Sequence, residues 1–428
     1  MFRDALKWLL LLFAAAAIAL GTALGLNDGF LRMQKSEISA AIPTPAPTVA
    51  AQPEATPAPT PTASPTPAPT AAPEERIDAA IRARIGGMTN EEKIGQLLLF
   101  GFTGTDRQSD TFTEILDEYA VGNLILYGQN VSSGDKDGGF ARCGALIDTV
   151  TGALKTDIPP IVAIDVEGGS VVRFGWEVWP SSARTLGRKN DPDYARSEFF
   201  AIGKALVETG IRLDLAPVLD TAPDPLKTFL GTRILSGDAE IAADMGAAII
   251  KGLHDAGCLS AAKHFPGHGG TPKDSHAETP VVRKTADELA AYDLIPFRRA
   301  IEGGVDAVLV AHILFPALDE ADIASQSEPI ITGLLRDTLG FTGVVISDDF
   351  RMGGLTSRYD PDEAAVGFLL AGGDLIMCGA QPERQKTIAK GLTHAVADGV
   401  ISAERLDESV YRVLRMKVDA GIWSPAAE

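Results

Sequence analysis

Short apolar runs recur between residues 97 and 380, and they constrain the fold more than any other feature of the sequence. Each run is rich in Val, Ile, Leu and Ala without a strict alternation of polar residues, which is typical of parallel strands covered on both faces. The runs span residues 97–102, 121–128, 158–169, 211–220, 258–267, 305–316, 342–350 and 373–380. We therefore predict eight parallel strands.

Helix-like stretches alternate with these runs. They cover residues 141–154, 193–208, 238–256, 286–302 and 362–371, and two more follow the last run at 382–397 and 403–418. Another helix is expected to begin at Thr89, because Thr89 and Glu92 have capping-box spacing. This alternation predicts an α/β protein, a single (β/α)8 TIM-type barrel over residues 76–428. The alternative, a doubly wound open sheet, lacks a glycine-rich phosphate loop after its first strand.

The N-terminal part of the sequence has a different character. Arg3 and Lys7 precede an apolar stretch, residues 8–26, which is long enough to cross a bilayer. We interpret residues 1–40 as a signal anchor and its flank, with a cleaved signal peptide as the alternative. Residues 41–75 are mostly Pro, Thr and Ala, a composition that predicts a disordered, extended linker. Together these segments predict an extracytoplasmic domain that is tethered to the membrane or secreted.

Charge and cysteine content narrow the function classes. The formal net charge is -19, and no basic stripe is present that could bind phosphates, so a nucleic-acid partner is excluded. The three cysteines, Cys143, Cys258 and Cys378, are far apart in the sequence and form no paired motif. We expect them to be buried, unpaired thiols.

Titratable side chains gather where the predicted strands end. Asp165 and Glu167 end the third strand, Asp220 ends the fourth and Asp348 ends the seventh. The densest group, KHFPGHGGTPKDSHAETP at residues 263–280, follows the fifth strand. In a barrel the carboxyl ends of all strands open on one face, where catalytic groups sit. We therefore expect one reaction site on that face.

Asp348 and His276 are the candidate reactive groups. A carboxylate fixed beside a sugar carbon can act as a nucleophile through an oxocarbenium-like transition state. His276 is a candidate acid and base, since imidazole titrates near neutral pH and Asp274 can fix its tautomer.

Two structural or metal-based interpretations compete with this one. Either Asp348 or Asp349 could cap the following helix. The histidines of residues 263–280 could bind zinc together with Asp274, but neither an HxH on the first strand nor an HExxH motif is present, so no metal is expected. His268, between glycines, is expected to brace its loop.

Six segments stand out in order along the chain: MTNEEKIGQLL, DVEGGSVVRF, APVLD, KHFPGHGGTPKDSHAETP, DAVLVAHI and GVVISDDFRMGG. Together they resemble the motifs of glycoside hydrolase family 3, specifically its β-N-acetylhexosaminidase branch. The resemblance covers residues 88–423, and KHFPGHG followed by DSH is its most specific part. Other members of the wider family often take a glutamate acid from a second domain; the sequence here ends after the barrel's last helix, so the acid is expected from the barrel.

The resemblance implies a retaining exo-β-N-acetylglucosaminidase that removes terminal β-linked N-acetylglucosamine from peptidoglycan fragments or chitin-type oligosaccharides. Asp348 matches the nucleophile that forms a glycosyl-enzyme, and His276 matches the acid/base, assisted by Asp274. The matched substrate-binding positions are Asp165, Arg173, Arg233, Lys263 and His264. No cofactor is implied, the partner is a glycan, and a monomer is expected.

Three positions depart from the family pattern. Relatives often have glutamine at the position of Val166. They often have serine and glutamate at the positions of Arg351 and Gly353. They remove no catalytic group but bear on substrate preference. The nearest alternative function is a β-N-acetylglucosaminide phosphorylase with the same site, because a histidine does not repel anionic phosphate. A non-catalytic wall-binding barrel protein is the alternative from another class; the presence of all three expected catalytic residues argues against it.

Overall fold

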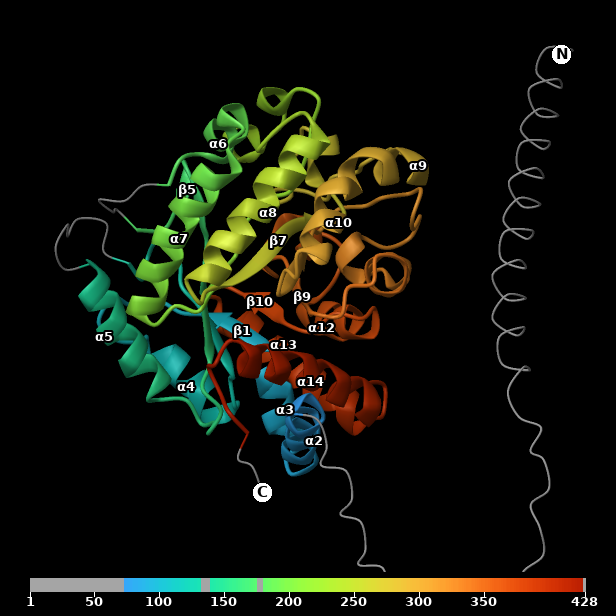
Figure 1. The fold of residues 1–428 in the computed structure, drawn as a ribbon. Helices are drawn as coiled ribbons and strands as arrows, with labels where there is room; N and C mark the ends of the chain where they lie inside the picture. Colours follow the sequence, from blue (N-terminus) through green and yellow to red (C-terminus); the bar gives the residue numbers. More distant parts are fainter. Residues whose placement is uncertain (1–72, 132–138, 175–179, 426–428) are drawn as a thin grey trace, which may run out of the picture. The chain divides into compact units, whose positions relative to one another are not determined.

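The computed structural model describes residues 73–131, 139–174 and 180–425, which form a barrel of parallel strands surrounded by helices (Figure 1). The barrel strands are β1 (Leu98–Gly101), β2 (Asn123–Ile125), β3 (Ile161–Ile164), β6 (Leu213–Asp214), β7 (Leu259–Phe265), β8 (Ala307–Val310), β9 (Val344–Ser347) and β10 (Ile376–Cys378). Their order is β10-β1-β2-β3-β6-β7-β8-β9, and a parallel bridge between Ile346 and Leu375 joins the two ends of that order. The α/β class and a nearly closed, eight-stranded TIM-like barrel are therefore confirmed.

Burial explains why the strand runs in the sequence are continuously apolar. All residues of β1, β3, β8 and β9 are buried, so neither face of these strands meets solvent. One face fills the barrel interior, and the other is covered by helices. Parallel pairing sets a common register: Leu99 of β1 pairs with Met377 on one side and with Asn123 on the other. The carboxyl ends of the strands consequently lie at one end of the barrel.

Helices follow the strands in the expected alternation. They are α2 (Pro73–Gly86), α3 (Asn90–Gln96), α4 (Asp110–Glu118), α5 (Gly139–Thr151), α6 (Ala183–Lys189), α7 (Pro192–Thr209), α8 (Ala239–Asp255), α9 (Ala286–Glu288), α10 (Leu294–Glu302), α11 (Gly353–Thr356), α12 (Pro361–Leu370), α13 (Pro382–Ala397) and α14 (Ala403–Asp419). The 3-10 helices are η1 (Pro225–Lys227), η2 (Gly231–Arg233), η3 (His268–Gly270) and η5 (Ala324–Gln326). The π-helices are η4 (Leu289–Asp293) and η6 (Pro329–Thr338). The predicted capping box is confirmed at α3, where Thr89 and Glu92 bond each other's backbone N–H groups. Helices α2, α4, α6 and α11 were not predicted.

The third predicted strand is wrong over its last residues. Strand β3 ends at Ile164, and β4 (Val166–Gly168) pairs with β5 (Val171–Val172) in a separate antiparallel hairpin. Gly168 and Gly169 have φ values of 92° and 61°, which glycine adopts readily and which turn the chain back. The hairpin carries Glu167 over the end of the barrel.

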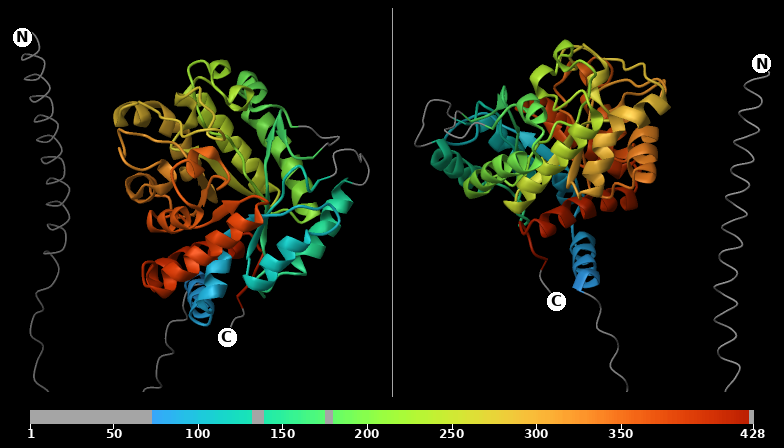
Figure 2. Two further views of the ribbon diagram at one scale, coloured as in Figure 1. Left: turned by 180° about the vertical axis from the view of Figure 1, so that it is seen from behind. Right: turned by 45° about the horizontal axis from the view of Figure 1, so that its top comes forward.

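The first and last helices of the described chain pack together. In both views the blue α2 lies beside the red α14 (Figures 1 and 2). The Tyr411 hydroxyl of α14 donates to Asp78 Oδ1 of α2 at 2.7 Å. Because α2 begins at Pro73, the end of the segment that we assigned to the linker is helical.

Some expectations fall outside these residues. The expected anchor and residues 41–72 of the expected linker lie in the part of the chain that is not described, and no described helix is long and apolar enough to span a membrane. Cys143, Cys258 and Cys378 are buried free thiols, as predicted.

Candidate active site

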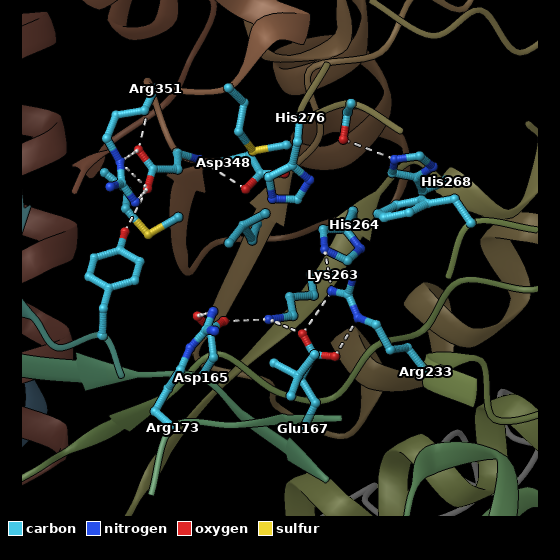
Figure 3. Close-up of a pocket in the computed structure, with 18 residues that line it drawn as sticks. Asp165, Glu167, Arg173, Arg233, Lys263, His264, His268, His276, Asp348 and Arg351 are labelled. Carbon is cyan, nitrogen blue, oxygen red and sulfur yellow. Dashed lines mark hydrogen bonds and ion pairs between the residues drawn. The ribbon is translucent and has the colours of Figure 1, made fainter. Parts of the chain in front are cut away.

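A cavity of about 450 Å³ opens at the carboxyl ends of the strands, and Figure 3 shows the side chains that line it. Loops that follow β2, β3, β6, β7 and β9 all contribute to its wall. The predicted site residues that line the cavity are Asp165, Arg173, Arg233, Lys263, His264, His276 and Asp348. Asp274, the remaining predicted residue, bonds to His276. The structure therefore brings together groups that are up to 183 positions apart, from Asp165 to Asp348.

A local irregularity in β7 lets two consecutive side chains reach the cavity. Lys263 and His264 would point to opposite faces of a regular strand. However, the pairing of β7 with β8 shifts register between Lys263 and Phe265, and both Lys263 and His264 line the cavity.

A network of buried ion pairs forms one wall of the cavity. Lys263 Nζ donates to Asp165 Oδ1 and contacts Glu167 Oε1, each at 2.7 Å. Arg173 Nη2 donates to Asp165 Oδ2 at 2.8 Å, and Arg233 binds both oxygens of Glu167 at 2.7 and 2.8 Å. Bidentate arginine pairs of this kind fix geometry as well as charge.

The cations keep the two carboxylates of this wall ionised. Burial alone would raise the pKa of Asp165, but Lys263 and Arg173 hold it below its ordinary value. Burial likewise opposes ionisation of Glu167, and Lys263 and Arg233 lower its pKa. The wall thus presents fixed carboxylate acceptors beside fixed cationic donors, an arrangement suited to the hydroxyl groups of a sugar.

His264 is oriented by a carboxylate beneath it. Its Nδ1 lies 2.6 Å from Asp220 Oδ2, and Asp220 is completely buried. Burial raises the pKa of Asp220, but His264 and His268 lower it below its ordinary value. The charged carboxylate accepts from Nδ1 and so fixes the orientation of the ring. The other ring nitrogen, Nε2, lies 3.4 Å from Arg233 Nη2, and His264 lines the cavity.

The adjacent aspartates Asp348 and Asp349 have different surroundings. Asp348 Oδ1 accepts from the Asp349 N–H at 2.9 Å, and no other hydrogen bond holds the Asp348 carboxylate among the described residues. Helix α11 has Met352 at its N-cap, without a side-chain cap, so the helix-capping interpretation is wrong for both aspartates.

Asp349 is instead held by several protein donors. It accepts from the Tyr127 hydroxyl at 2.7 Å, from Arg351 Nη2 at 2.6 Å and from the Gly379 N–H at 3.2 Å. Burial raises its pKa, but Arg351 and Tyr127 lower it below its ordinary value. Of the two carboxylates, Asp348 is therefore the one with an oxygen left to face the cavity.

His276 and Asp274 form the predicted pair. His276 Nδ1 lies 2.8 Å from Asp274 Oδ1, which also accepts from the His276 N–H. Burial raises the pKa of Asp274, but its hydrogen bonds to His276 lower it, which keeps the carboxylate charged. The His276 side chain is 63% exposed, and Nε2 is left for proton transfer.

The loop that carries His276 docks on the loop that follows Asp348. The Gly353 N–H donates to His276 O at 3.0 Å, and the Gly354 N–H donates to Ser275 O at 2.8 Å. A Cβ on Gly353 would lie 2.6 Å from Ala277 O, closer than real contacts allow. Glycine at position 353 therefore permits this close approach of the loops that carry His276 and Asp348.

His268 braces the same loop, as predicted. Its Nε2 lies 3.0 Å from Ser275 Oγ, and its N–H donates to Asp220 Oδ1 at 2.5 Å. Burial lowers the pKa of His268, which keeps its ring neutral. In the described part of the chain, no group of three or more His, Cys, Asp or Glu side chains has the geometry to hold a metal.

Two polar residues of the cavity, Tyr127 and Arg351, were not assigned to the site from the sequence. Glu167 and Asp349 were located at strand ends but were given no role in binding. Tyr127 follows β2, so the strand-end rule could have identified it. Arg351 was noted only as a departure; its guanidinium lies 4.8 Å from the centre of the Tyr127 ring.

Comparison with known sequences identifies relatives over most of the described chain. Residues 89–416 match the model of the glycosyl hydrolase family 3 N-terminal domain. Beta-hexosaminidase A of Pseudoalteromonas piscicida is 29% identical over 371 residues, which are 77% of this chain and 61% of that protein. A beta-hexosaminidase of Tolumonas auensis is 34% identical over 268 residues, which are 62% of this chain and 77% of that protein.

Solved structures agree with the sequence comparison. The structure of a glycoside hydrolase family 3 beta-N-acetylglucosaminidase from Paenibacillus sp. matches with a TM-score of 0.74 and 36% identity, covering 80% of this chain and 64% of that one. The chain thus spans less than two thirds of the length of this protein and of the Pseudoalteromonas relative.

Proposed function

The chain belongs to glycoside hydrolase family 3, and on that premise we propose that it is a retaining exo-β-N-acetylglucosaminidase. The observation that carries the proposal is the placing of Asp348 and the Asp274–His276 pair on one sugar-sized cavity. The names of the hexosaminidase relatives support the choice of N-acetylglucosamine as the sugar.

In the first step, Asp348 is the nucleophile. A carboxylate oxygen forms a bond to the anomeric carbon while the bond from that carbon to the glycosidic oxygen breaks. The departing oxygen keeps the electron pair and takes the proton from His276 Nε2. Asp274 stabilises the imidazolium that precedes this transfer, because its carboxylate accepts from Nδ1.

In the second step, His276 is the base. Water attacks the anomeric carbon of the glycosyl-enzyme, its proton passes to His276 Nε2, and the ester bond to Asp348 breaks with the electron pair returning to the carboxylate. Two inversions at one carbon give overall retention. The site is then restored for the next substrate.

The ion-pair wall binds the sugar in this proposal. Asp165 and Lys263 sit close enough to share one hydroxyl group, and Arg173, Arg233 and His264 offer further polar atoms. A cavity of about 450 Å³ suits one terminal sugar better than an internal segment of a long chain, which supports exo-action.

For the substrate we propose peptidoglycan fragments or chitin-type oligosaccharides, met outside the cytoplasmic membrane. The apolar residues 8–26 and the Pro-, Thr- and Ala-rich segment after them support a tethered or secreted enzyme.

The test is hydrolysis of 4-nitrophenyl N-acetyl-β-glucosaminide by the full chain, with Asp348→Ala and His276→Ala variants. Asp360→Ala, at an exposed aspartate, is the matched control. We expect the parent and the control to release nitrophenol, NMR to show the β-anomer first, and Asp348→Ala to lose nearly all activity.

Other outcomes would change the assignment. The α-anomer as first product would contradict retention. A sugar phosphate formed in the presence of phosphate would identify the phosphorylase. If the parent cleaves none of three glycosides, neither this one nor a β-glucoside nor a β-xyloside, the wall-binding protein would be favoured.

A further inference from the structure

We propose that Asp220 and His268 are positioning residues that tie the sugar-binding His264 to the loop of the acid/base His276. The proposal rests on the proposed function and deepens it. It gives a role in the reaction to two buried groups that neither attack nor protonate the substrate.

The two carboxylate oxygens of Asp220 hold different parts of the site. Oδ2 accepts from His264 Nδ1 at 2.6 Å, while Oδ1 accepts from the His268 N–H at 2.5 Å. Asp220 has no exposed surface, so water cannot substitute for either partner without rearrangement. One carboxylate therefore fixes the sugar-binding ring and the start of the acid/base loop together.

The His268 ring continues the connection. Its Nε2 lies 3.0 Å from Ser275 Oγ, and Ser275 stands between Asp274 and His276 in the chain. Within the described residues the buried His268 Nδ1 has no hydrogen-bond partner, so Ser275 is the polar contact that orients the ring. Phe229 packs against it, with ring centres 5.1 Å apart.

Backbone packing makes the connection stiff. A Cβ on Gly269 would lie 1.8 Å from Thr221 O, so η3 rests directly on the segment that follows Asp220. A Cβ on Gly270 would approach Val282 to 2.9 Å. These glycines permit close contact, so a shift of Asp220 and Thr221 would displace the start of the loop at His268 and Gly269.

Leaving-group dependence separates this role from a purely structural one. Acid catalysis matters for a poor leaving group such as the sugar alcohol released from chitobiose, and little for 2,4-dinitrophenolate. The values of kcat/KM for these two N-acetylglucosaminides report on the first chemical step in each case. Their ratio therefore measures how well His276 is positioned.

The variants are Asp220→Asn, His268→Leu and His268→Gln in the full chain. Asparagine cannot accept from both His264 and His268, and leucine cannot bond Ser275, whereas glutamine offers a polar atom near the position of Nε2. We expect His268→Leu to lower kcat/KM for chitobiose about tenfold and for the dinitrophenyl glycoside less than about threefold, a part of the ~10²–10⁴-fold that acid catalysis supplies. His268→Gln should recover much of the loss.

Asp220→Asn should show two effects. Loss of His264 orientation should lower kcat/KM for both substrates. Because His276 is also mispositioned, kcat/KM for chitobiose should fall about tenfold more than kcat/KM for the dinitrophenyl glycoside. Asp293→Asn is the matched control: Asp293 is buried beside Gly267, and its partner is Lys284. It should leave the ratio of the two kcat/KM values unchanged.

An equal fall in kcat/KM for both substrates in Asp220→Asn and His268→Leu would overturn the proposal. Hydrogen exchange gives a readout that needs no substrate: amides of residues 271–279 should exchange faster in these two variants than in Asp293→Asn. Unchanged exchange would also overturn it. If the parent cleaves neither substrate, the proposed function fails, and exchange alone decides whether Asp220 and His268 hold the loop.

Discussion

The barrel buries charged side chains at both ends, but it satisfies them differently. At the amino end of the strands, Asp374 accepts from the Val345 N–H, the Ser409 hydroxyl, Arg336 and Arg412, at distances from 2.6 to 3.1 Å. At the carboxyl end, one hydrogen bond holds the Asp348 carboxylate in the described structure, and that carboxylate faces a cavity.

The comparison separates buried charge that supports folding from buried charge that supports chemistry. A carboxylate whose oxygens are saturated by protein donors cannot act on a ligand, whereas one with a free oxygen beside a cavity can. Burial of charge alone would have marked both ends as candidate sites. The two ends differ in whether a buried carboxylate has an oxygen without a protein donor that faces a cavity.

The largest effect is expected at the carboxyl end. Asp348→Asn should lower kcat by at least about 10³-fold, because the proposed mechanism loses its nucleophile. It should not lower the free energy of unfolding, since the amide oxygen keeps the bond from Asp349 N–H and a poorly paired buried charge is removed. Activity assays measure kcat, and urea unfolding measures the free energy of unfolding. A clear loss of stability would show that Asp348 also supports folding, against the distinction drawn here.

The opposite outcome is expected from Asp374→Asn. Removal of this charge leaves Arg336 and Arg412 without their buried partner and should lower the free energy of unfolding by about 3 kcal/mol or more. At temperatures where the variant is folded, kcat/KM should equal that of the parent. A large fall in kcat/KM would show that the two ends are not independent.

Lys417 adds a pH test at the amino end. Its Nζ donates to Gln96 Oε1 and Gly122 O, and burial lowers its pKa to about 7. Since the unfolded side chain has a pKa of about 10.4, the unfolded state binds a proton between about pH 7 and about pH 10.4 that the folded state does not. The free energy of unfolding from this group should therefore rise with pH, by about 1.4 kcal/mol per pH unit.

Lys417→Met should remove that rise. Urea unfolding of the parent and the variant at about pH 7.5 and about pH 9 compares the two slopes. Parallel pH dependence in the two proteins would contradict a neutral Lys417.

The smallest effect concerns the ion-pair wall. Glu167→Gln weakens the bonds to Arg233 and Lys263, and one charged hydrogen bond is worth about 1.5 kcal/mol or more. We expect about a tenfold rise in KM with a smaller change in kcat, because in the proposed mechanism the wall binds the sugar and does not react. A fall in kcat alone, at unchanged KM, would place Glu167 in the chemistry instead.

The strand pattern of the fold could be predicted because buried parallel strands leave a strong local signal. All eight barrel strands lie within the predicted runs. The β4–β5 hairpin was missed because its first strand follows β3 after Asp165 alone, so that the two strands were predicted as one run. Helix α6 has only seven residues, too few to show a helical period. Helix α4 has a clear apolar face, formed by Phe112, Ile115 and Leu116, which the sequence analysis overlooked.

The residues of the site could be predicted from the sequence, but the hydrogen bonds that connect them could not. Strand ends and the DSH segment located Asp348, His276 and Asp274. The link from Asp220 to His264 spans 44 positions, and its link to His268 spans 48, which no local pattern encodes. The opposite environments of Asp348 and Asp349 depend on Tyr127, far away in the sequence.

The central claim is that Asp348 forms a covalent bond to the sugar, while His276 acts first as the acid and then as the base. The most direct measurement is intact-mass spectrometry of His276→Ala mixed with the 2,4-dinitrophenyl N-acetylglucosaminide, which needs no acid to react but does need a base for release. The account predicts a mass increase of one N-acetylglucosaminyl group, mapped by peptide digestion to Asp348. Dinitrophenolate release without any adduct, or an adduct on another residue, would contradict it.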